Sequence, residues 1–436
     1  MKQPKNKPET LCMAPWTHTY LSPQTERRMC CASREDAQSF EQYIDTKEGS
    51  GEYQPITLHD HWNSDHMKSV RRRMMAGETL PECEVCNDKL LNTDVYRSYF
   101  THLFGSKYYS KIWETTDETG YTEMNPVSWD YRFSNLCNFK CRTCGDMLSS
   151  SWESEQRQFK MINWDNPKNN WMKPEVKREI EKFQDSVVEQ EFAQAVEQHR
   201  IEEVYWVGGE PLMYEQHWKY MKRIVELGDG PNVYARYNTN LSRVEYRGVN
   251  LYRDILSNLR DWQICASIDG TEAIGEYIRT GLKYDKWLEN YNQAVETANT
   301  KRQVRIDFTL TLPGLFEVNN IQALAEKTNT EVLAKVIFSF TPDIILSPLA
   351  LPRDLLDPWV DDIVNTLPEG AMRDVMLQLK ARPTFAEQWP NEYEQALVKG
   401  KRRILQLEQI RNDKLTLRDI LSNKQSILEW WDSIGS

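Results

Sequence analysis

The sequence lacks the features that would place the protein in a membrane or on a nucleic acid. No apolar run approaches the ~20 residues that span a bilayer, and residues 1–10 are polar, without the apolar core of a signal peptide. Basic residues are not in excess: 54 Lys and Arg stand against 65 Asp and Glu, giving a net charge of −11. Because polyanions select basic surfaces, we expect no nucleic acid and no membrane among the partners. The sequence predicts a cytoplasmic protein.

Cysteine is scarce and unevenly distributed. Only 9 of the 436 residues are cysteine, and eight of them precede Gly145. In a reducing compartment, short clusters of thiols indicate metal ligation or catalysis more often than disulfides. No internal repeat or low-complexity segment accompanies them.

The densest cysteine cluster is the segment Cys137-Asn138-Phe139-Lys140-Cys141-Arg142-Thr143-Cys144, here called the cysteine loop. Three thiolates in one short loop can hold three corners of a [4Fe–4S] cube and leave one iron open. The alternative is a zinc site, which needs four ligands when it is closed. No His lies near the loop, since the nearest are His102 and His199.

A second set of cysteines lies in the first 90 residues. It comprises Cys12, the pair Cys30-Cys31 and the CxxC pair formed by Cys83 and Cys86. Four thiolates suit either a structural zinc ion or a fully ligated iron–sulfur cluster. We expect His59, His61 and His66 to belong to a loop and a helix start, with a metal site as the alternative. For the adjacent Arg71, Arg72 and Arg73 we expect a solvated helix face, with anion binding as the alternative.

From residue 127 onward, strand and helix patterns alternate. Strands are predicted at residues 127–134, 203–207, 233–238, 262–267, 304–311 and 334–340, with helical periodicities at 176–192, 214–225 and 288–298. Strands joined by helices predict an α/β fold with a parallel sheet, and six of them predict a partial TIM-like (β/α)6 barrel.

Strand parity predicts a polar face inside this barrel. In residues 304–311 the even positions are apolar and the odd positions polar. Only one set can face the helices, so we expect the polar set to face the lumen. The same parity would turn Arg236, Asn238, Cys265, Ser267 and Asp269 inward.

The ends of these strands carry residues suited to a ligand. The second strand is followed by Gly208-Gly209-Glu210-Pro211, in which two glycines admit a ligand close to the backbone and a carboxylate can accept from an ammonium group. Barrel active sites lie at the carboxyl ends of strands. The other candidates there are Asn238, Asn240, Ser267, Asp269 and, for bidentate pairing with a carboxylate, Arg279.

The order of these motifs resembles the radical S-adenosylmethionine (SAM) superfamily. The resemblance implies that Cys137, Cys141 and Cys144 hold a [4Fe–4S] cluster whose open iron binds SAM. Thr143 departs from the family, which often has an aromatic residue against the adenine at this position. By the same resemblance the SAM contacts are Gly208, Gly209, Glu210, Asn238, Asn240, Ser267, Asp269 and Arg279.

The N-terminal cysteines, in their order and surroundings, resemble the SPASM/twitch module, which carries auxiliary [4Fe–4S] clusters in many radical SAM enzymes. The resemblance implies one auxiliary cluster on Cys12, Cys30, Cys83 and Cys86, with Cys31 as the spare thiol. The module usually follows the barrel, and here it precedes it. Zinc is the alternative at this site.

The resemblance implies an enzyme that reductively cleaves SAM to a 5′-deoxyadenosyl radical and abstracts hydrogen from a substrate. A peptide or protein side chain is the leading substrate hypothesis, with an electron donor such as flavodoxin or ferredoxin. A radical SAM dehydrogenase or epimerase of a small molecule is one alternative. A non-catalytic iron–sulfur or zinc scaffold is the other.

Four regions are predicted. They are a SPASM/twitch-like module at residues 1–90, an aromatic-rich linker at 91–125, the barrel at 126–345 and a helical region at 346–436. Helices in the last region are expected at 359–367, 372–379, 392–410 and 426–431, with Trp430 and Trp431 docked on the rest of the protein.

Overall fold

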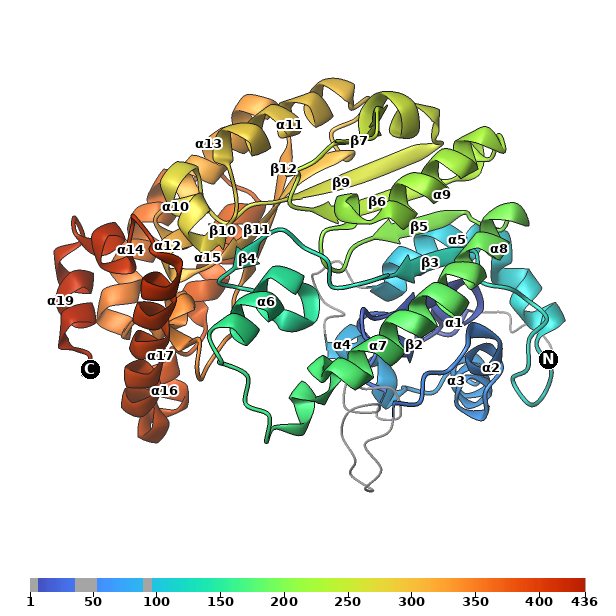
Figure 1. The fold of residues 1–436 in the computed structure, drawn as a ribbon, viewed down its shortest axis with the longest axis horizontal. Helices are drawn as coiled ribbons and strands as arrows, with labels where there is room; N and C mark the ends of the chain where they lie inside the picture. Colours follow the sequence, from blue (N-terminus) through green and yellow to red (C-terminus); the bar gives the residue numbers. More distant parts are fainter. Residues whose placement is uncertain (1–6, 36–52, 89–95, 436) are drawn as a thin grey trace. The chain divides into compact units, whose positions relative to one another are not determined.

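The computed structural model describes residues 7–35, 53–88 and 96–435. The predicted boundary between residues 90 and 91 lies outside these ranges, as do the first six residues. The chain forms two compact units, each built from several segments. Unit 1 comprises residues 1–137, 146–236 and 253–262, and unit 2 comprises 138–145, 237–252 and 263–436. Figure 1 shows the path of the chain through both. The four predicted regions stay a prediction.

Unit 1 contains a mostly parallel set of strands. The order is β5 (Glu203–Trp206), β3 (Ser128–Tyr131), β1 (His18–Leu21) and β2 (Arg27–Arg28). β1 pairs parallel with β3 and β3 pairs parallel with β5, whereas β2 is antiparallel to β1. The two N-terminal strands were not predicted, because β1 is buried at all four positions and β2 has only two residues, so neither shows an alternation. The helices of unit 1 are α1 (Ala14–Thr17), α2 (Leu58–Trp62), α3 (Asp65–Met75), α4 (Glu84–Asp88), α5 (Tyr96–Thr115), α6 (Ser150–Gln158), α7 (Pro174–Phe183), α8 (Glu189–Glu197) and α9 (Glu215–Glu226).

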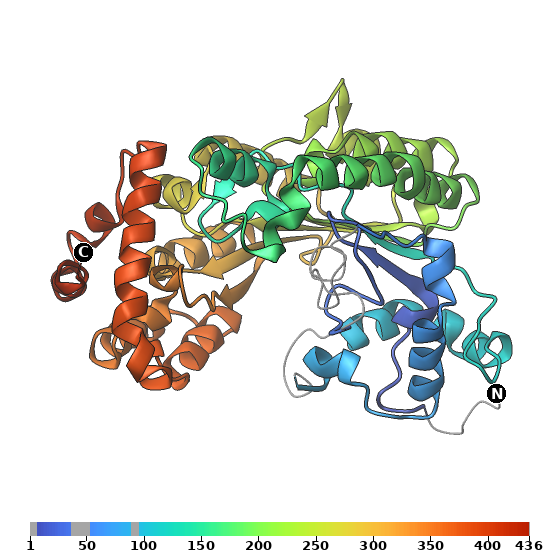
Figure 2. The ribbon, with the colours of Figure 1, turned by 60° about the horizontal axis from the view of Figure 1, so that its bottom comes forward.

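Helices cover both faces of these strands. The Phe192 ring of α8 lies 5.6 Å from the Trp129 ring and 5.8 Å from the Trp206 ring. On the other face, the His18 ring of β1 lies 4.5 Å from the Phe100 ring of α5. Figure 2 shows the green helices on one side and the blue helices on the other.

Unit 2 contains β11 (Val304–Leu310), which lies between β9 (Asp261–Ser267) and β12 (Glu331–Val336) in parallel pairings. β9 and β6 (Tyr234–Thr239) each contain residues of both units. The short strands of unit 2 are β4 (Lys140–Cys141), β7 (Glu245–Tyr246), β8 (Val249–Asn250) and β10 (Arg279–Thr280). Its helices are α10 (Glu272–Ile278), α11 (Tyr284–Thr297), α12 (Leu312–Leu315), α13 (Val318–Thr328), α14 (Arg353–Thr366), α15 (Ala371–Ala381), α16 (Phe385–Gln388), α17 (Pro390–Arg411), α18 (Leu417–Leu421) and α19 (Gln425–Ser433).

The secondary structure confirms most of the predicted elements. Each of the six predicted strand ranges overlaps an observed strand, and the observed pairings between those strands are parallel within each unit. This is a mixed α/β fold, whereas closure into a partial barrel stays a prediction. The last strand, β12, starts and ends earlier than predicted, since Phe338 lies beyond it with 55% of its surface exposed.

Two segments differ from their predictions. The segment predicted as a linker contains α5, a helix of 20 residues. Its buried side chains Phe100, Phe104, Tyr108 and Ile112 recur every four residues, so they lie on one helical face and pack into the core of unit 1. The pattern at 176–192 is two helices, α7 and α8, joined by a π-helical turn at Gln184–Val188. The helices of the C-terminal region, orange to red in Figure 1, are present as predicted, and Trp431 is 1% exposed.

The polar strand face is present in unit 2. Along β11 the apolar residues are buried and the polar residues are half-buried in strict alternation. In the parallel register Arg305 lies opposite Cys265, and Asp307 lies opposite Ser267, so these four share one face. Asn238 donates to the Asp307 carboxylate at 2.8 Å, which places it there as well. No helix in the described ranges is both long enough and apolar enough to cross a membrane.

Candidate functional site

The first cysteine of the cysteine loop, Cys137, is held by the start of α6 in unit 1. The Cys137 N–H donates to Ser150 Oγ at 3.2 Å, and Ser151 Oγ donates to the Cys137 carbonyl at 2.7 Å. The Ser150 N–H donates to the Asn135 carbonyl at 2.7 Å. Ser149 caps the helix by accepting from the Trp152 N–H. A capped helix end therefore fixes the backbone on both sides of Cys137.

The other two cysteines of the loop belong to unit 2. Cys141 pairs with Arg279 across β4 and β10, and the Cys144 N–H donates to the Cys141 carbonyl at 3.1 Å. Gly281 has φ +112°, and a Cβ there would lie 2.9 Å from the Asn138 carbonyl oxygen, so only glycine lets the loop approach this turn. Burial raises the pKa of the Cys141 thiol to about 12. A metal that bound this thiol would have to displace its proton.

Arg279 lies between this thiol and a buried carboxylate. Its guanidinium makes a two-point ion pair with Asp269 at 2.9 and 3.0 Å, and its Nη1 is 4.0 Å from Cys141 Sγ. Burial opposes the charge, but the Asp269 and Cys141 groups raise the pKa of Arg279 above its usual value. Asp269 also accepts from the Thr309 N–H at 2.9 Å. The structure thus brings two predicted SAM contacts together and pairs Arg279 with Asp269.

The Gly-Gly-Glu-Pro segment packs directly on the chain that precedes Cys137. The Glu210 N–H donates to the Leu136 carbonyl at 2.7 Å. A Cβ at Gly209 would lie 2.3 Å from that same oxygen, and Gly208 has φ +122°. Gly209 thus admits a neighbouring backbone and Gly208 admits the side chains of Tyr214 and Arg132, whereas the sequence suggested that the two glycines admit a ligand.

The Glu210 side chain is buried, with 1% of its surface exposed. Its Oε1 accepts from the Leu212 N–H at 3.0 Å and caps the short 3-10 turn Pro211–Met213. Tyr214 Oη accepts from the Gly209 N–H at 2.8 Å and donates to the Ser134 carbonyl at 2.6 Å. The segment is therefore tied to residues 134–136 at several points.

Asn240, another predicted SAM contact, bonds to the cysteine loop within unit 2. Its Nδ2 donates to Asn138 Oδ1 at 3.1 Å, and its Oδ1 accepts from the Ser242 N–H at 2.9 Å. Asn138 Nδ2 donates in turn to Ser242 Oγ at 3.0 Å. Asn238 and Ser267 lie instead on the polar face around Asp307.

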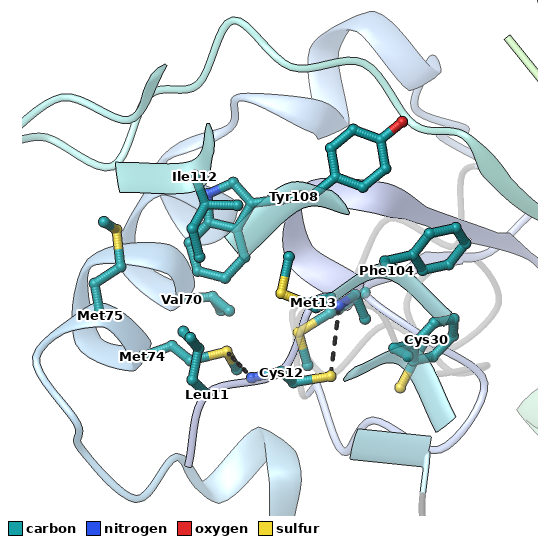
Figure 3. Packing of buried hydrophobic residues seen from close by; sticks show 14 of the residues in the cluster. Leu11, Cys12, Met13, Cys30, Val70, Met74, Met75, Phe104, Tyr108 and Ile112 are labelled. Atoms are coloured by element: carbon teal, nitrogen blue, oxygen red, sulfur yellow. Dashed lines mark hydrogen bonds between the residues drawn. The ribbon is translucent and has the colours of Figure 1, made fainter. Parts of the chain in front are cut away.

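The N-terminal cysteines line one cavity of unit 1. Cys12, Cys30, Cys83 and Cys86 all contribute to its wall, and each is less than a tenth exposed. Cys30 and not Cys31 is among the described residues that line it. Figure 3 shows Cys12 and Cys30 beside the apolar cluster packed around Met13 and Phe104.

The chemistry of this donor set fits an iron–sulfur cluster. Burial raises the pKa of the Cys12 thiol to about 12 and that of Cys83 to about 11. Across the described ranges, no three or more His, Cys, Asp or Glu side chains are arranged to hold one metal ion. The four thiols instead line a cavity, and a four-iron cluster takes one thiolate at each iron.

Arg71, in α3, holds the backbone next to Cys12. Its guanidinium is fully buried and donates to the Pro15 carbonyl at 2.8 Å and to the Trp62 carbonyl at 2.7 Å. It also donates to Asn63 Oδ1 at 2.9 Å. Both expectations for Arg71, a solvated face and an anion site, are therefore wrong. Burial lowers the pKa of Arg71 to about 9.

The three neighbouring histidines lie in different environments. His66 Nε2 lies 2.8 Å from Glu35 Oε1. The hydrogen bond to this carboxylate is the largest of the effects that raise the pKa of His66. His61 is buried, and burial lowers its pKa well below the usual value. His59 is exposed. The structure gives them separate surroundings in α2 and α3.

Sequence reasoning missed two arginines at these sites. Arg97 lines the four-cysteine cavity and donates to Asn87 Oδ1 at 2.7 Å. Arg142, inside the cysteine loop, forms an ion pair with Asp413. The position of Arg142 between two ligands could have drawn attention to it, but no local pattern marks Asp413, because 271 residues separate the two.

Comparisons with known proteins find similarity among solved structures. No family model and no curated protein matches the chain. SuiB of Streptococcus suis bound to S-adenosylmethionine is 15% identical, with a TM-score of 0.34 over 76% of this chain and 68% of its own. The enzyme anSMEcpe with bound AdoMet and the Cp18Cys peptide is 16% identical, with a TM-score of 0.32 over 54% and 59%. TYW1 with a lysine-pyruvate adduct bound is 15% identical, with a TM-score of 0.28 over 57% and 75%. Likeness at this level establishes neither the activity nor the substrate of this chain.

Proposed function

We propose that this chain is a radical SAM enzyme, with a SAM-binding [4Fe–4S] cluster on Cys137, Cys141 and Cys144. The observation that carries the proposal is the packing of the Gly-Gly-Glu-Pro segment on the residues before Cys137. Glu210 and Leu136 are joined by a backbone hydrogen bond of 2.7 Å. Two motifs that are 70 residues apart in the chain, and whose order suggested SAM chemistry, are thus neighbours in the fold. A scaffold protein has no need of this juxtaposition.

The residues divide the work of holding SAM and the cluster. When bound, the cluster supplies one electron that cleaves SAM to methionine and a 5′-deoxyadenosyl radical, which abstracts hydrogen from the substrate. Glu210 would accept from the SAM ammonium group. Asn240, which is hydrogen-bonded to Asn138, would contact SAM and orient it. The polar face around Ser267 and Asp307 would contact the substrate. Burial of Glu210 and Asn240 would help to exclude water from the reacting atoms.

Cys12, Cys30, Cys83 and Cys86 would hold an auxiliary [4Fe–4S] cluster. The proposal is supported by the cavity that these thiols share. Arg97 lies in the wall of that cavity, and its positive charge would stabilise the negative charge of a cluster ligated by four thiolates. Three thiols leave an iron open to SAM, whereas four close the cluster to it. The auxiliary cluster would therefore relay electrons or bind substrate without touching SAM.

The substrate class that we propose is a peptide or protein side chain, and the electron donor a flavodoxin or ferredoxin. This follows from the likeness of the N-terminal cysteines to the SPASM/twitch pattern. The proposed reaction starts with hydrogen abstraction from the side chain. The enzyme would accordingly be an oxidoreductase or another peptide-modifying enzyme.

The test is electron paramagnetic resonance of the anaerobically reconstituted and reduced protein, with and without SAM. SAM should change one of two cluster signals. Cys141→Ala should remove the SAM-responsive signal, and Cys83→Ala should leave it. Cys265→Ala is the matched control, because Cys265 is equally buried but lies on β9, outside both cysteine sets. A spectrum that does not respond to SAM in fully loaded wild-type protein would contradict the proposal.

A further inference from the structure

The C-terminal region contacts the cysteine loop through a buried arginine. Arg142 follows Cys141 directly, and its N–H donates to the Ile278 carbonyl at 2.8 Å. Its side chain has no exposed surface. The guanidinium lies 3.7 Å above the centre of the Tyr277 ring, a cation–π contact. Arg142 is therefore fixed on one side by the end of α10.

The charge of Arg142 is balanced from the C-terminal region. Its Nη2 donates to the Asp413 carboxylate, and its Nη1 donates to Thr280 Oγ1 at 3.0 Å and to the Tyr277 carbonyl. Asp413 is largely buried, with 14% of its side chain exposed. A buried charge needs a partner of opposite sign, and Asp413 forms the ion pair with this guanidinium.

Asp413 is itself positioned by the end of α17. The helix ends at Arg411, and the capping residue Asn412 adopts the left-handed conformation. The Asp413 N–H donates to the Glu408 carbonyl at 3.0 Å. Glu408 makes a second tie, since its Oε1 accepts from Tyr277 Oη at 2.7 Å and from the Leu417 N–H at 2.7 Å. Two carboxylates at one helix end thus reach α10 and the cysteine loop.

We propose that Asp413 is a positioning residue for the SAM-binding cluster, which it controls by holding and neutralising Arg142 beside Cys141. This inference rests on the proposed function. The reduction potential of a cluster depends on the net charge around it. Without Asp413, the uncompensated Arg142 charge favours the reduced cluster, raises its potential and makes it a weaker reductant of SAM.

The experiment is a redox titration of the SAM-responsive signal in the full chain, together with 5′-deoxyadenosine release. Asp413→Asn should shift the potential in the positive direction by about 59 mV, which for one electron is a tenfold change in equilibrium constant. It should slow 5′-deoxyadenosine release as well. Asp413→Glu should restore both values. The double variant Arg142→Gln/Asp413→Asn, which removes both charges, should return the potential toward that of the wild type.

The matched control is Asp432→Asn, which breaks an ion pair with Arg418 in the same region. That pair spans 2.9 Å but is exposed on both sides, so its loss should change neither value. An Asp413→Asn protein with the potential and rate of the wild type would overturn the inference. So would equal loss of iron in Asp413→Asn and Asp413→Glu, since the charge would then be irrelevant. Absence of any SAM-responsive signal in the wild type would instead overturn the proposed function.

Discussion

At the scale of single residues, Glu210 has two roles that a substitution can separate. Its Oε1 accepts from the Leu212 N–H, which a glutamine carbonyl can also do. In the proposed function, the negative charge would serve a bound ammonium group, and glutamine lacks that charge. Glu210→Gln should therefore leave the fold intact and weaken SAM binding by ~1–3 kcal/mol, the scale of a hydrogen bond to a charged group. Calorimetry on protein with matched iron content measures this, and an unchanged affinity would remove Glu210 from the SAM site.

Gly209 tests the packing of the two motifs. A Cβ there would lie 2.3 Å from the Leu136 carbonyl oxygen, so Gly209→Ala must push apart the segments around Glu210 and Cys137. Overpacking of this kind costs ~1–3 kcal/mol. Gly145→Ala is the matched control, because a Cβ at Gly145 meets nothing within 4 Å. Chemical unfolding should show a lower midpoint for Gly209→Ala alone, and equal stability of the two variants would show that the packing is not tight.

At the scale of elements, α3 supports the four-cysteine cavity through Arg71. Its guanidinium satisfies the carbonyls of Pro15 and Trp62, and methionine would fill the space but leave both carbonyls buried without a donor. Each buried unsatisfied group costs ~1–3 kcal/mol. Arg71→Met should therefore lower the thermal unfolding midpoint and the iron bound by the N-terminal cysteines. Arg72→Met, on the exposed side of the same helix, should do neither. Similar losses in both variants would mean that the burial of Arg71 is unimportant.

The elements also show where sequence patterns succeed. The alternation in residues 304–311 predicted the polar face of β11, because every second side chain of a strand shares a face. β1 escaped prediction because all four of its residues are buried, which leaves no alternation to detect. The aromatic spacing of four in α5 was available in the sequence, but Gly105 interrupts the pattern with a residue that is typical of turns. That glycine lies inside the helix, where it is tolerated.

The candidate site was predictable where ligands are close in sequence and hidden where they are not. The cysteine loop and the Gly-Gly-Glu-Pro segment are local motifs, and the second of them contacts Leu136, the residue that precedes the loop. Arg279 was assigned to a SAM carboxylate, but its pairing with Asp269 depends on the parallel register of β9 and on the position of β10. The Arg142–Asp413 pair depends on where α17 ends. Such contacts are properties of the assembled fold.

At the scale of the whole molecule, the two cysteine sets predict the metal content. Cys137, Cys141 and Cys144 would hold one cluster and the four-cysteine cavity another. Anaerobically reconstituted protein should therefore carry about eight irons per chain. The triple variant Cys12→Ala/Cys83→Ala/Cys86→Ala should retain about four by the same count. Iron and zinc analysis of protein isolated without oxygen measures this, and stoichiometric zinc would contradict the assignment.

The most direct test of radical SAM chemistry is 5′-deoxyadenosine release by fully iron-loaded protein with dithionite and SAM under strict exclusion of oxygen. The wild type should release it slowly even without its substrate, because solvent or buffer can quench the radical. Cys141→Ala should release none, and Cys83→Ala should release less than the wild type but more than none, since the proposed auxiliary cluster would not contact SAM. If Cys141→Ala protein still cleaves SAM, or if the loaded wild type never does, the chain is not a radical SAM enzyme.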